Sequence, residues 1–183
     1  VHGIPTLNTL MLHMINNKDF GTIDFSHLRA TIAGGMSTQS RIAKQWQKIT
    51  GCVVNEGYGL SETSPIISLS ENHRSFSGNV GKPAPNTEVR VVNSTGEVLG
   101  FDIAGELEVK GPQVMRGYWK IEANDNDNPF SEDGWFKTGD YGTIDEHGVI
   151  RLTGRKKYQI NKAGIKIHPE DTDMLLESND GVS

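Results

Sequence analysis

Apolar residues at helical spacing occupy the first part of the chain. Four of them share one stripe at positions i, i+3, i+4 and i+7: Leu7, Leu10, Met11 and Met14. This spacing predicts a helix over residues 4–16. A short apolar segment from Leu28 to Ala33 then predicts a buried strand, which stops at Gly34-Gly35.

A second helix and strand follow directly. Ser37 or Thr38 can cap a helix that stops at Gly51, and its inner face consists of Ile42, Trp46 and Ile49. The segment Cys52–Val54 predicts the next strand. Because a strand, a helix and a strand follow one another closely, they form a βαβ unit, and we expect its two strands to be parallel.

Two glycine-rich segments follow the carboxyl ends of these strands. They are Gly34–Met36 and Glu56–Glu62, whose sequence is EGYGLSE. Open parallel sheets bind ligands at this edge, so the two segments predict a ligand site. The alternative is that tight connections simply use glycine.

Beyond residue 75 the pattern changes to strands with alternating apolar and polar residues. Four such strands are predicted, with turn residues between them: Glu88–Val92, Glu106–Lys110, Lys137–Ile144 and Val149–Thr153. They favour an antiparallel sheet or a small barrel. A last helix is expected from Pro169 to Ser178.

Composition excludes several classes of protein. The 183 residues include 18 Lys and Arg against 23 Asp and Glu, a net charge of −5, which argues against a globally basic nucleic-acid binder. Apolar segments are far shorter than the ~18 residues that indicate a membrane span. The one cysteine, Cys52, excludes an internal disulfide framework and favours a reducing compartment. We therefore expect a cytoplasmic protein, with peripheral membrane contact as an open alternative.

The basic residues are unevenly distributed. Residues 147–169 carry six of them and no acid: Arg151, Arg155, Lys156, Lys157, Lys162 and Lys166. Such a cluster on an acidic protein suggests a phosphate-bearing ligand. A solvated surface is the alternative.

Residue chemistry within these segments suits a nucleotide. Tyr58 can stack on a base, Ser61 can hydrogen-bond a phosphate, and Glu62 can hold Mg²⁺. Further along the chain, Asp140 follows Thr138-Gly139 at a tight turn, where a carboxylate can accept hydrogen bonds from two ribose hydroxyls.

These segments resemble the adenylate-forming superfamily of acyl-CoA synthetases, nonribosomal adenylation domains and luciferases. The similar motifs occur in family order along essentially the whole chain: Gly34–Met36, Gly57–Glu62, Gly78–Pro83, Gly105–Leu107, Gly117–Trp119, Gly134-Trp135, Thr138–Asp140 and Gly154–Lys157. The segments Glu56–Pro65 and Lys110–Trp119 are most similar to bacterial long-chain fatty acid–CoA ligases.

The resemblance implies a role for each matching residue. Tyr58 stacks on adenine in a pocket shaped by its glycine-rich neighbours: Gly34, Gly35, Met36, Gly57 and Gly59. Ser61 lies at the phosphate and acyl carboxylate, and Glu62 binds Mg²⁺. Asp140 binds the ribose hydroxyls, and Arg155 reaches the ribose and phosphate.

Two further positions concern movement and the thiol substrate. Lys157 matches the hinge between a large and a small domain, and Gly164 matches a loop that lines the pantetheine tunnel.

Two positions depart from the family pattern. Tyr158 stands where the family often carries an acid, and Thr172 replaces an apolar anchor of the expected last helix.

The implied fold class is α/β plus β. A parallel βαβ layer over residues 1–75 precedes an antiparallel distorted barrel subdomain over 76–154, and 155–183 begin a small α+β C-terminal domain. The resemblance covers only the later part of the large domain and the start of the small one. We therefore expect a piece of a longer enzyme, inactive by itself.

The implied activity is that of an ATP-dependent fatty acid–CoA ligase. It would use ATP, Mg²⁺ and coenzyme A, forming acyl-adenylate first and acyl-CoA second, with AMP released. Two alternatives remain. One is an adenylation domain that loads an amino or aryl acid onto a carrier protein, and the other is a catalytically silent nucleotide-binding module.

Overall fold

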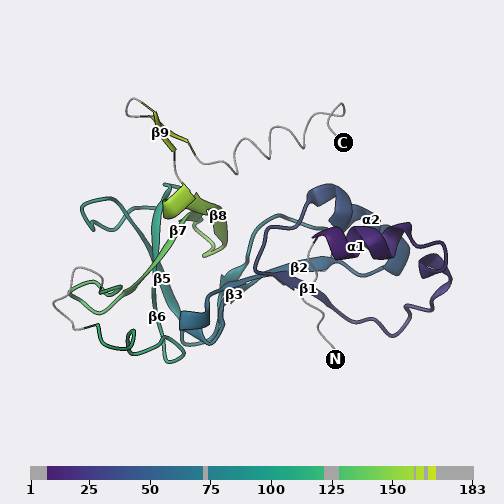
Figure 1. The fold of residues 1–183 in the computed structure, drawn as a ribbon, viewed down its shortest axis with the longest axis horizontal. Coiled ribbons are helices and arrows are strands. Elements are labelled where there is room, and N and C mark those ends of the chain that lie inside the picture. Colours follow the sequence, from purple (N-terminus) through teal and green to yellow (C-terminus); the bar gives the residue numbers. More distant parts are fainter. Residues whose placement is uncertain (1–7, 72–73, 122–127, 159, 163–164, 168–183) are drawn as a thin grey trace. The chain divides into compact units, whose positions relative to one another are not determined.

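The computed structural model describes residues 8–71, 74–121, 128–158, 160–162 and 165–167. The chain divides into two compact units, Val1–Ala84 and Pro85–Ser183. Among the described residues both contain β-sheet and the first also contains α-helix, so the chain is a mixed α/β protein (Figure 1). The predicted subdomain boundaries at 75/76 and 154/155 stay predictions.

The first unit contains a four-stranded sheet in the order β1-β2-β3-β4, two α-helices and two short 3₁₀ turns. In chain order the elements are α1 (Asn8–Asn16), η1 (Phe20–Thr22), β1 (Thr31–Gly34), α2 (Ser40–Thr50), β2 (Val54–Gly59), η2 (Ser61–Thr63), β3 (Ile66–Leu69) and β4 (Lys82–Pro83).

The predicted βαβ unit is confirmed, since β1 and β2 pair in parallel with Gly34 opposite Gly57. However, β2 begins at Val54, the last residue of the predicted strand, and continues through Gly59, so the first half of the expected loop over 56–62 is strand. The reason lies on its other side, where β3 pairs antiparallel with Gly57–Gly59 and supplies hydrogen-bonding neighbours. The sheet is therefore mixed.

The limits of α2 follow the backbone contacts at its two ends. The cap residue is Gln39, and neither Ser37 nor Thr38 takes that position. Thr38 instead donates its backbone N–H to Glu56, which places it in a contact with β2. The predicted stop at Gly51 is confirmed, because Gly51 is left-handed with φ 71° and donates to the Gln47 carbonyl at 2.8 Å.

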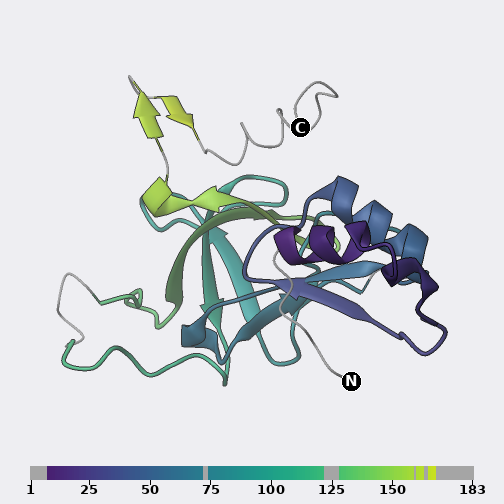
Figure 2. The same cartoon turned by 45° about the vertical axis from the view of Figure 1, so that its right-hand side comes forward.

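Both helices lie on one face of this sheet (Figure 2). The core between them and the strands includes Met11, Phe20, Ala43, Trp46 and Val54. Trp46 stacks against Phe20 at a tilt, and its indole N–H donates to the Thr31 hydroxyl at 3.0 Å. The apolar face predicted for the second helix is thus confirmed, with Ile42 and Trp46 buried. In the first helix Met11 is buried, but Leu10 of the predicted stripe is exposed.

The second unit contains an antiparallel sheet in the order β5-β6-β7-β8. Its strands are β5 (Glu88–Val92), β6 (Gly105–Lys110), β7 (Phe136–Ile144) and β8 (Ile150–Arg155). The four predicted strands are therefore confirmed within two residues at each end. In the described part of the chain β5 and β8 are outer strands that do not pair with each other, so the expected barrel is an open sheet here.

A short turn and a hairpin follow the second sheet. They are η3 (Lys156–Tyr158), β9 (Ile160–Lys162) and β10 (Ile165–Ile167), of which the last two pair antiparallel. The expected helix from Pro169 to Ser178 lies outside the described residues. None of the helices in the described ranges has the length and apolar character that crossing a membrane requires.

A charged network joins the outer strand β5 to the turn before β7. Arg90 pairs with Glu108 at 2.7 Å and with Asp133 at 2.6 Å, and its guanidinium lies 4.4 Å from the centre of the Trp135 ring. Hydrogen bonds from Arg90 and then Ser131 lower the pKa of Asp133 to about 2. The motif Gly134-Trp135 therefore has a structural explanation in this unit.

Close strand contact predicts a different tolerance at two glycines of β2. A Cβ at Gly59 would overlap the Pro65 carbonyl oxygen, whereas one at Gly57 would meet the Leu69 Cδ1 atom at an ordinary 3.6 Å. Gly59→Ala should therefore lower the free energy of unfolding by roughly 1–3 kcal/mol, as overpacking does. Urea denaturation measures this loss, and Gly57→Ala is the control, with a change below about 1 kcal/mol. Equal losses would contradict the packing described for Gly59.

Candidate functional site

The carboxyl ends of β1 and β2 bring the two glycine segments together. Gly34 lies opposite Gly57, and a Cβ at Gly34 would lie 3.1 Å from the Gly57 carbonyl oxygen. Gly35 is left-handed, with φ 82°, and the next side chain, Met36, is 61% exposed. The backbone is therefore uncovered at this edge, as close approach of a ligand requires.

Glu56 ties the connection after β1 to β2. Its Oε1 accepts the Thr38 backbone N–H at 2.8 Å, and its own N–H donates to the Ser70 hydroxyl at 2.9 Å. Burial raises the pKa of Glu56, and hydrogen bonds from Thr38 oppose that rise. This buried carboxylate lies in the predicted ligand segment 56–62, but no individual role was predicted for it. Its alternation with Tyr58 in a strand was the signal that could have identified it.

Tyr58 lies one residue beyond the last β1–β2 pair. Its side chain is buried, at 5% exposed, on the same strand face as Val54 and Glu56. Its placement at the carboxyl edge agrees with the predicted ligand edge. The stacking of Tyr58 on adenine stays a prediction.

The turn η2 presents Ser61 and Glu62. The fully buried Thr63 fixes the turn, because its hydroxyl accepts the Leu60 N–H at 3.0 Å and lies 2.8 Å from the Pro65 carbonyl oxygen as a donor. Ser61 is exposed and Glu62 is half-buried. The two predicted polar groups thus stand side by side on a turn with a rigid buried base.

One carboxylate at this turn fits the way proteins bind Mg²⁺. No group of three or more His, Cys, Asp or Glu residues suited to a metal occurs among the described residues. Mg²⁺ commonly uses only one or two protein carboxylates and completes its shell with water and substrate phosphates. Glu62 is therefore compatible with a cation that arrives with a nucleotide.

In the second unit, Asp140 and Arg155 form an ion pair. Arg155 Nε lies 2.7 Å from Asp140 Oδ1, and the two residues are register partners across β7 and β8. The side chain of Asp140 is only 5% exposed, whereas that of Arg155 is 43% exposed. The predicted tight turn at Asp140 is wrong, because Asp140 lies inside β7, although Gly139 before it is left-handed, with φ 72°. Two residues predicted separately for the ribose are thus in direct contact.

The next residue along the chain makes a second ion pair. Lys156 Nζ lies 2.7 Å from Glu106 Oε2, and this contact raises the pKa of Lys156. Lys157, the predicted hinge, is the middle residue of η3. Gly164, predicted for the pantetheine tunnel, lies outside the described residues.

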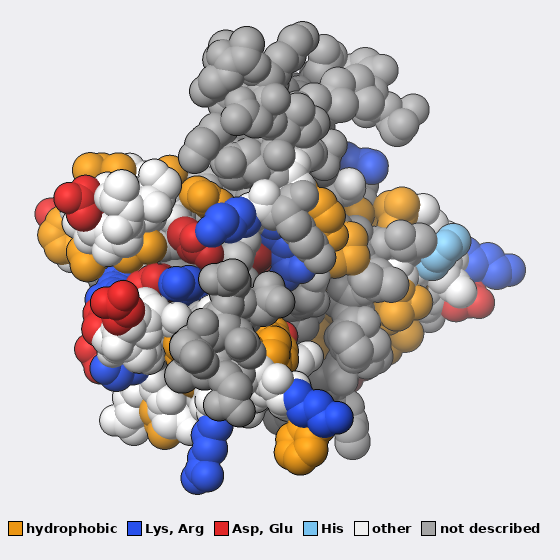
Figure 3. All heavy atoms as spheres, turned by 60° about the vertical axis from the view of Figure 1, so that its left-hand side comes forward, with side chains coloured by type: hydrophobic (Ala, Val, Ile, Leu, Met, Phe, Trp, Pro, Cys, Tyr) orange, Lys and Arg blue, Asp and Glu red, His pale blue; other side chains and the backbone are white. Residues whose placement is uncertain are grey.

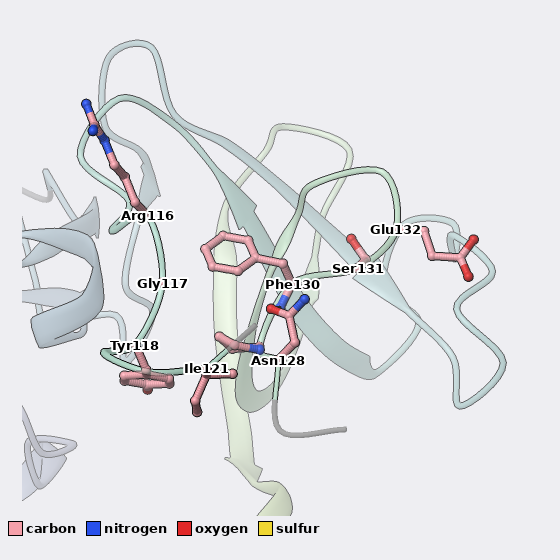
Figure 4. A pocket seen from close by; sticks show the side chains of 9 residues that line it. Arg116, Gly117, Tyr118, Ile121, Asn128, Phe130, Ser131 and Glu132 are labelled. Carbon is pink, nitrogen blue, oxygen red and sulfur yellow. The ribbon is translucent and has the colours of Figure 1, made fainter. Parts of the chain in front are cut away.

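Charges of both signs are intermixed on the face shown in Figure 3. A pocket of about 390 Å³ opens elsewhere in the second unit, and Figure 4 shows residues that line it, among them Arg116, Tyr118, Ile121, Asn128 and Phe130. None of its described lining residues is a predicted site residue. The predicted residues instead form two groups, one in each compact unit, around β1–β2 and around β7–β8.

Comparisons with known proteins identify the family of the chain. The chain is 39% identical over 177 residues to a long-chain-fatty-acid–CoA ligase of Salmonella typhimurium, covering 96% of this chain and 31% of that protein. The chain thus spans about a third of the length of the curated relatives it matches.

Solved structures show the same fold. ATP-bound MatB from Rhodopseudomonas palustris matches with a TM-score of 0.80 and 28% identity, over 94% of this chain and 34% of that one. The o-succinylbenzoate CoA synthetase of Bacillus subtilis, in complex with its acyl-adenylate intermediate, matches with a TM-score of 0.78 and 25% identity, over 98% and 36%. The family described as AMP-binding enzyme matches residues 1–119. The chain belongs to this AMP-binding enzyme family.

Proposed function

We propose that the chain is the nucleotide-binding part of an ATP-dependent fatty acid–CoA ligase. The observation that carries this proposal is the Asp140–Arg155 pair, in which an arginine at the end of β8 holds a buried carboxylate of β7. A carboxylate held in this way suits paired hydroxyls, and the arginine beside it suits phosphate. The similarity to a long-chain-fatty-acid–CoA ligase supports the choice of a fatty acid.

In the first half-reaction, a carboxylate oxygen of the fatty acid attacks the α-phosphorus of ATP. The bond to the β,γ-phosphates breaks, which gives acyl-adenylate and pyrophosphate. Tyr58 would stack on the adenine, Asp140 would accept hydrogen bonds from the ribose hydroxyls, and the Ser61 hydroxyl would donate a hydrogen bond to a phosphate oxygen. Positioning of this kind contributes more than bond-making by the protein in phosphoryl chemistry.

Charge neutralisation accompanies this positioning. Glu62 would hold Mg²⁺, which supplies positive charge at the phosphate oxygens when it is bound. Arg155 is more than two-fifths exposed at its side chain, so it can turn toward a phosphate while it stays close to Asp140.

In the second half-reaction, the thiol of coenzyme A attacks the acyl carbonyl carbon and AMP leaves. The thiol proton passes to solvent or to the departing phosphate. A rotation at Lys157 would exchange the states that serve the two half-reactions. The predicted basic segment after residue 150 would then meet the phosphates of coenzyme A.

Replacement of Asp140 tests the ribose assignment. In the full-length protein, Asp140→Ala should reduce use of ATP about ten- to a hundredfold, because a charged hydrogen bond is worth roughly 1.5–3 kcal/mol. The use of 2′-deoxy-ATP, which lacks one of the two hydroxyls, should fall by a smaller factor in this variant. Steady-state kinetics with both nucleotides measures the two ratios.

Asp133→Ala is the matched control for Asp140→Ala. Asp133 is an acid of the same unit that also pairs with an arginine, Arg90. Its replacement should leave the preference for ATP over 2′-deoxy-ATP unchanged. If Asp140→Ala reduces the use of ATP and the use of 2′-deoxy-ATP by the same factor, Asp140 does not bind the 2′-hydroxyl.

A proline at the predicted hinge tests the two-state mechanism. Lys157→Pro fixes φ near −65° and removes an N–H. It should therefore destabilise, by about 3 kcal/mol or roughly a hundredfold in population, whichever of the two states needs a different φ at residue 157. If the fixed state is the adenylate-forming one, acyl-adenylate formation should survive and transfer to coenzyme A should fail. Separate rate measurements of the two half-reactions, on protein shown to be folded, test this.

Lys157→Ala removes the same charge without restricting φ. It should therefore keep the ratio of the two half-reaction rates close to that of the unaltered protein. Parallel loss or parallel retention of both rates in Lys157→Pro would contradict the assignment of the hinge to residue 157.

A further inference from the structure

The carboxylate of Glu106 holds the residue immediately before the predicted hinge. Glu106 lies on β6, whereas Lys156 follows the last residue of β8, two strands away in the sheet order. The Lys156 side chain therefore reaches past β7 to make its 2.7 Å contact. Tyr141 of β7 adds a smaller electrostatic contribution to the raised pKa of Lys156.

Consecutive residues are thus tied to two different strands. Arg155 pairs with Asp140 on β7, and Lys156 pairs with Glu106 on β6. Under the proposed function the Asp140 carboxylate also accepts hydrogen bonds from the ribose hydroxyls. These hydroxyls compete with Arg155 for the carboxylate when nucleotide is bound. Glu106 has no such second role in this scheme. It belongs to the motif Gly105–Leu107, one of the segments that resemble the family.

We infer that Glu106 is a positioning residue that, through Lys156, keeps the hinge pivot at residue 157. The inference rests on the proposed function, since it concerns the rotation between the two half-reactions. Glu106 touches neither nucleotide nor acyl group in this scheme. It acts only by holding the chain that Lys157 continues.

The position of the pivot matters because of the chain's reach. A residue advances an extended chain by about 3.5 Å, so release of Lys156 would lengthen the free segment by that amount. Misplacement of reacting groups by 1 Å can already cost about a hundredfold in rate. Since Lys156 is 58% exposed at its side chain, the ion pair is of the modest kind, worth about two- to fivefold in an equilibrium.

Three variants of the full-length protein test the anchor. Glu106→Gln and Lys156→Met should each speed hydrogen exchange of the amides of residues 155–158 about two- to fivefold. They should also lower the rate of transfer to coenzyme A, relative to acyl-adenylate formation, by a similar factor. Glu88→Gln is the matched control and should change neither, because Glu88 is exposed on β5, the outer strand opposite β8.

A charge swap separates this role from a general structural one. Glu106→Lys combined with Lys156→Glu should restore both the slow exchange and the rate ratio. Unchanged exchange and an unchanged ratio in both single variants would overturn the inference, and so would a swap that restores neither. If the unaltered protein forms no acyl-adenylate, the proposed function fails, whereas the exchange measurement still decides whether Glu106 anchors Lys156.

Discussion

The ion pair between Asp140 and Arg155 is the interaction on which the proposed chemistry of the second unit depends. It joins β7 to the last residue of β8, so the carboxylate and the guanidinium are fixed by strand register as well as by charge. Because Asp140 is almost fully buried, an unpaired charge there would be costly. The same pair thus orients the carboxylate proposed to bind the ribose and fixes the chain just before the predicted hinge.

A comparable constraint acts in the first unit, where parallel pairing sets Gly34 beside Gly57. The absence of side chains at this edge leaves the backbone open, while Glu56 and Thr63 hold the segments on either side of Tyr58. Each unit therefore contains a small number of polar groups that are held by buried contacts. This arrangement suits catalysis that depends mainly on positioning.

Local pattern predicted much of this fold because apolar periodicity reports directly on burial. The helix ending at Gly51, the parallel pair β1–β2 and the four strands of the second sheet followed from it. The strand character of Glu56–Gly59 did not, since glycine is a poor strand former and the segment depends on pairing with the distant β3. Ion pairs such as Lys156–Glu106 were likewise invisible, because they join residues far apart in sequence.

The central claim is that this chain serves ATP-dependent ligation of a fatty acid to coenzyme A. Its most direct measurement is mass-spectrometric detection of acyl-adenylate after the full-length protein is incubated with ATP, Mg²⁺ and an acid, using fatty acids of graded length, aryl acids and amino acids in parallel. The account predicts acyl-adenylate from long-chain fatty acids and its conversion to acyl-CoA when coenzyme A is added. Adenylates formed only from aryl or amino acids, or from none of the acids, would contradict it.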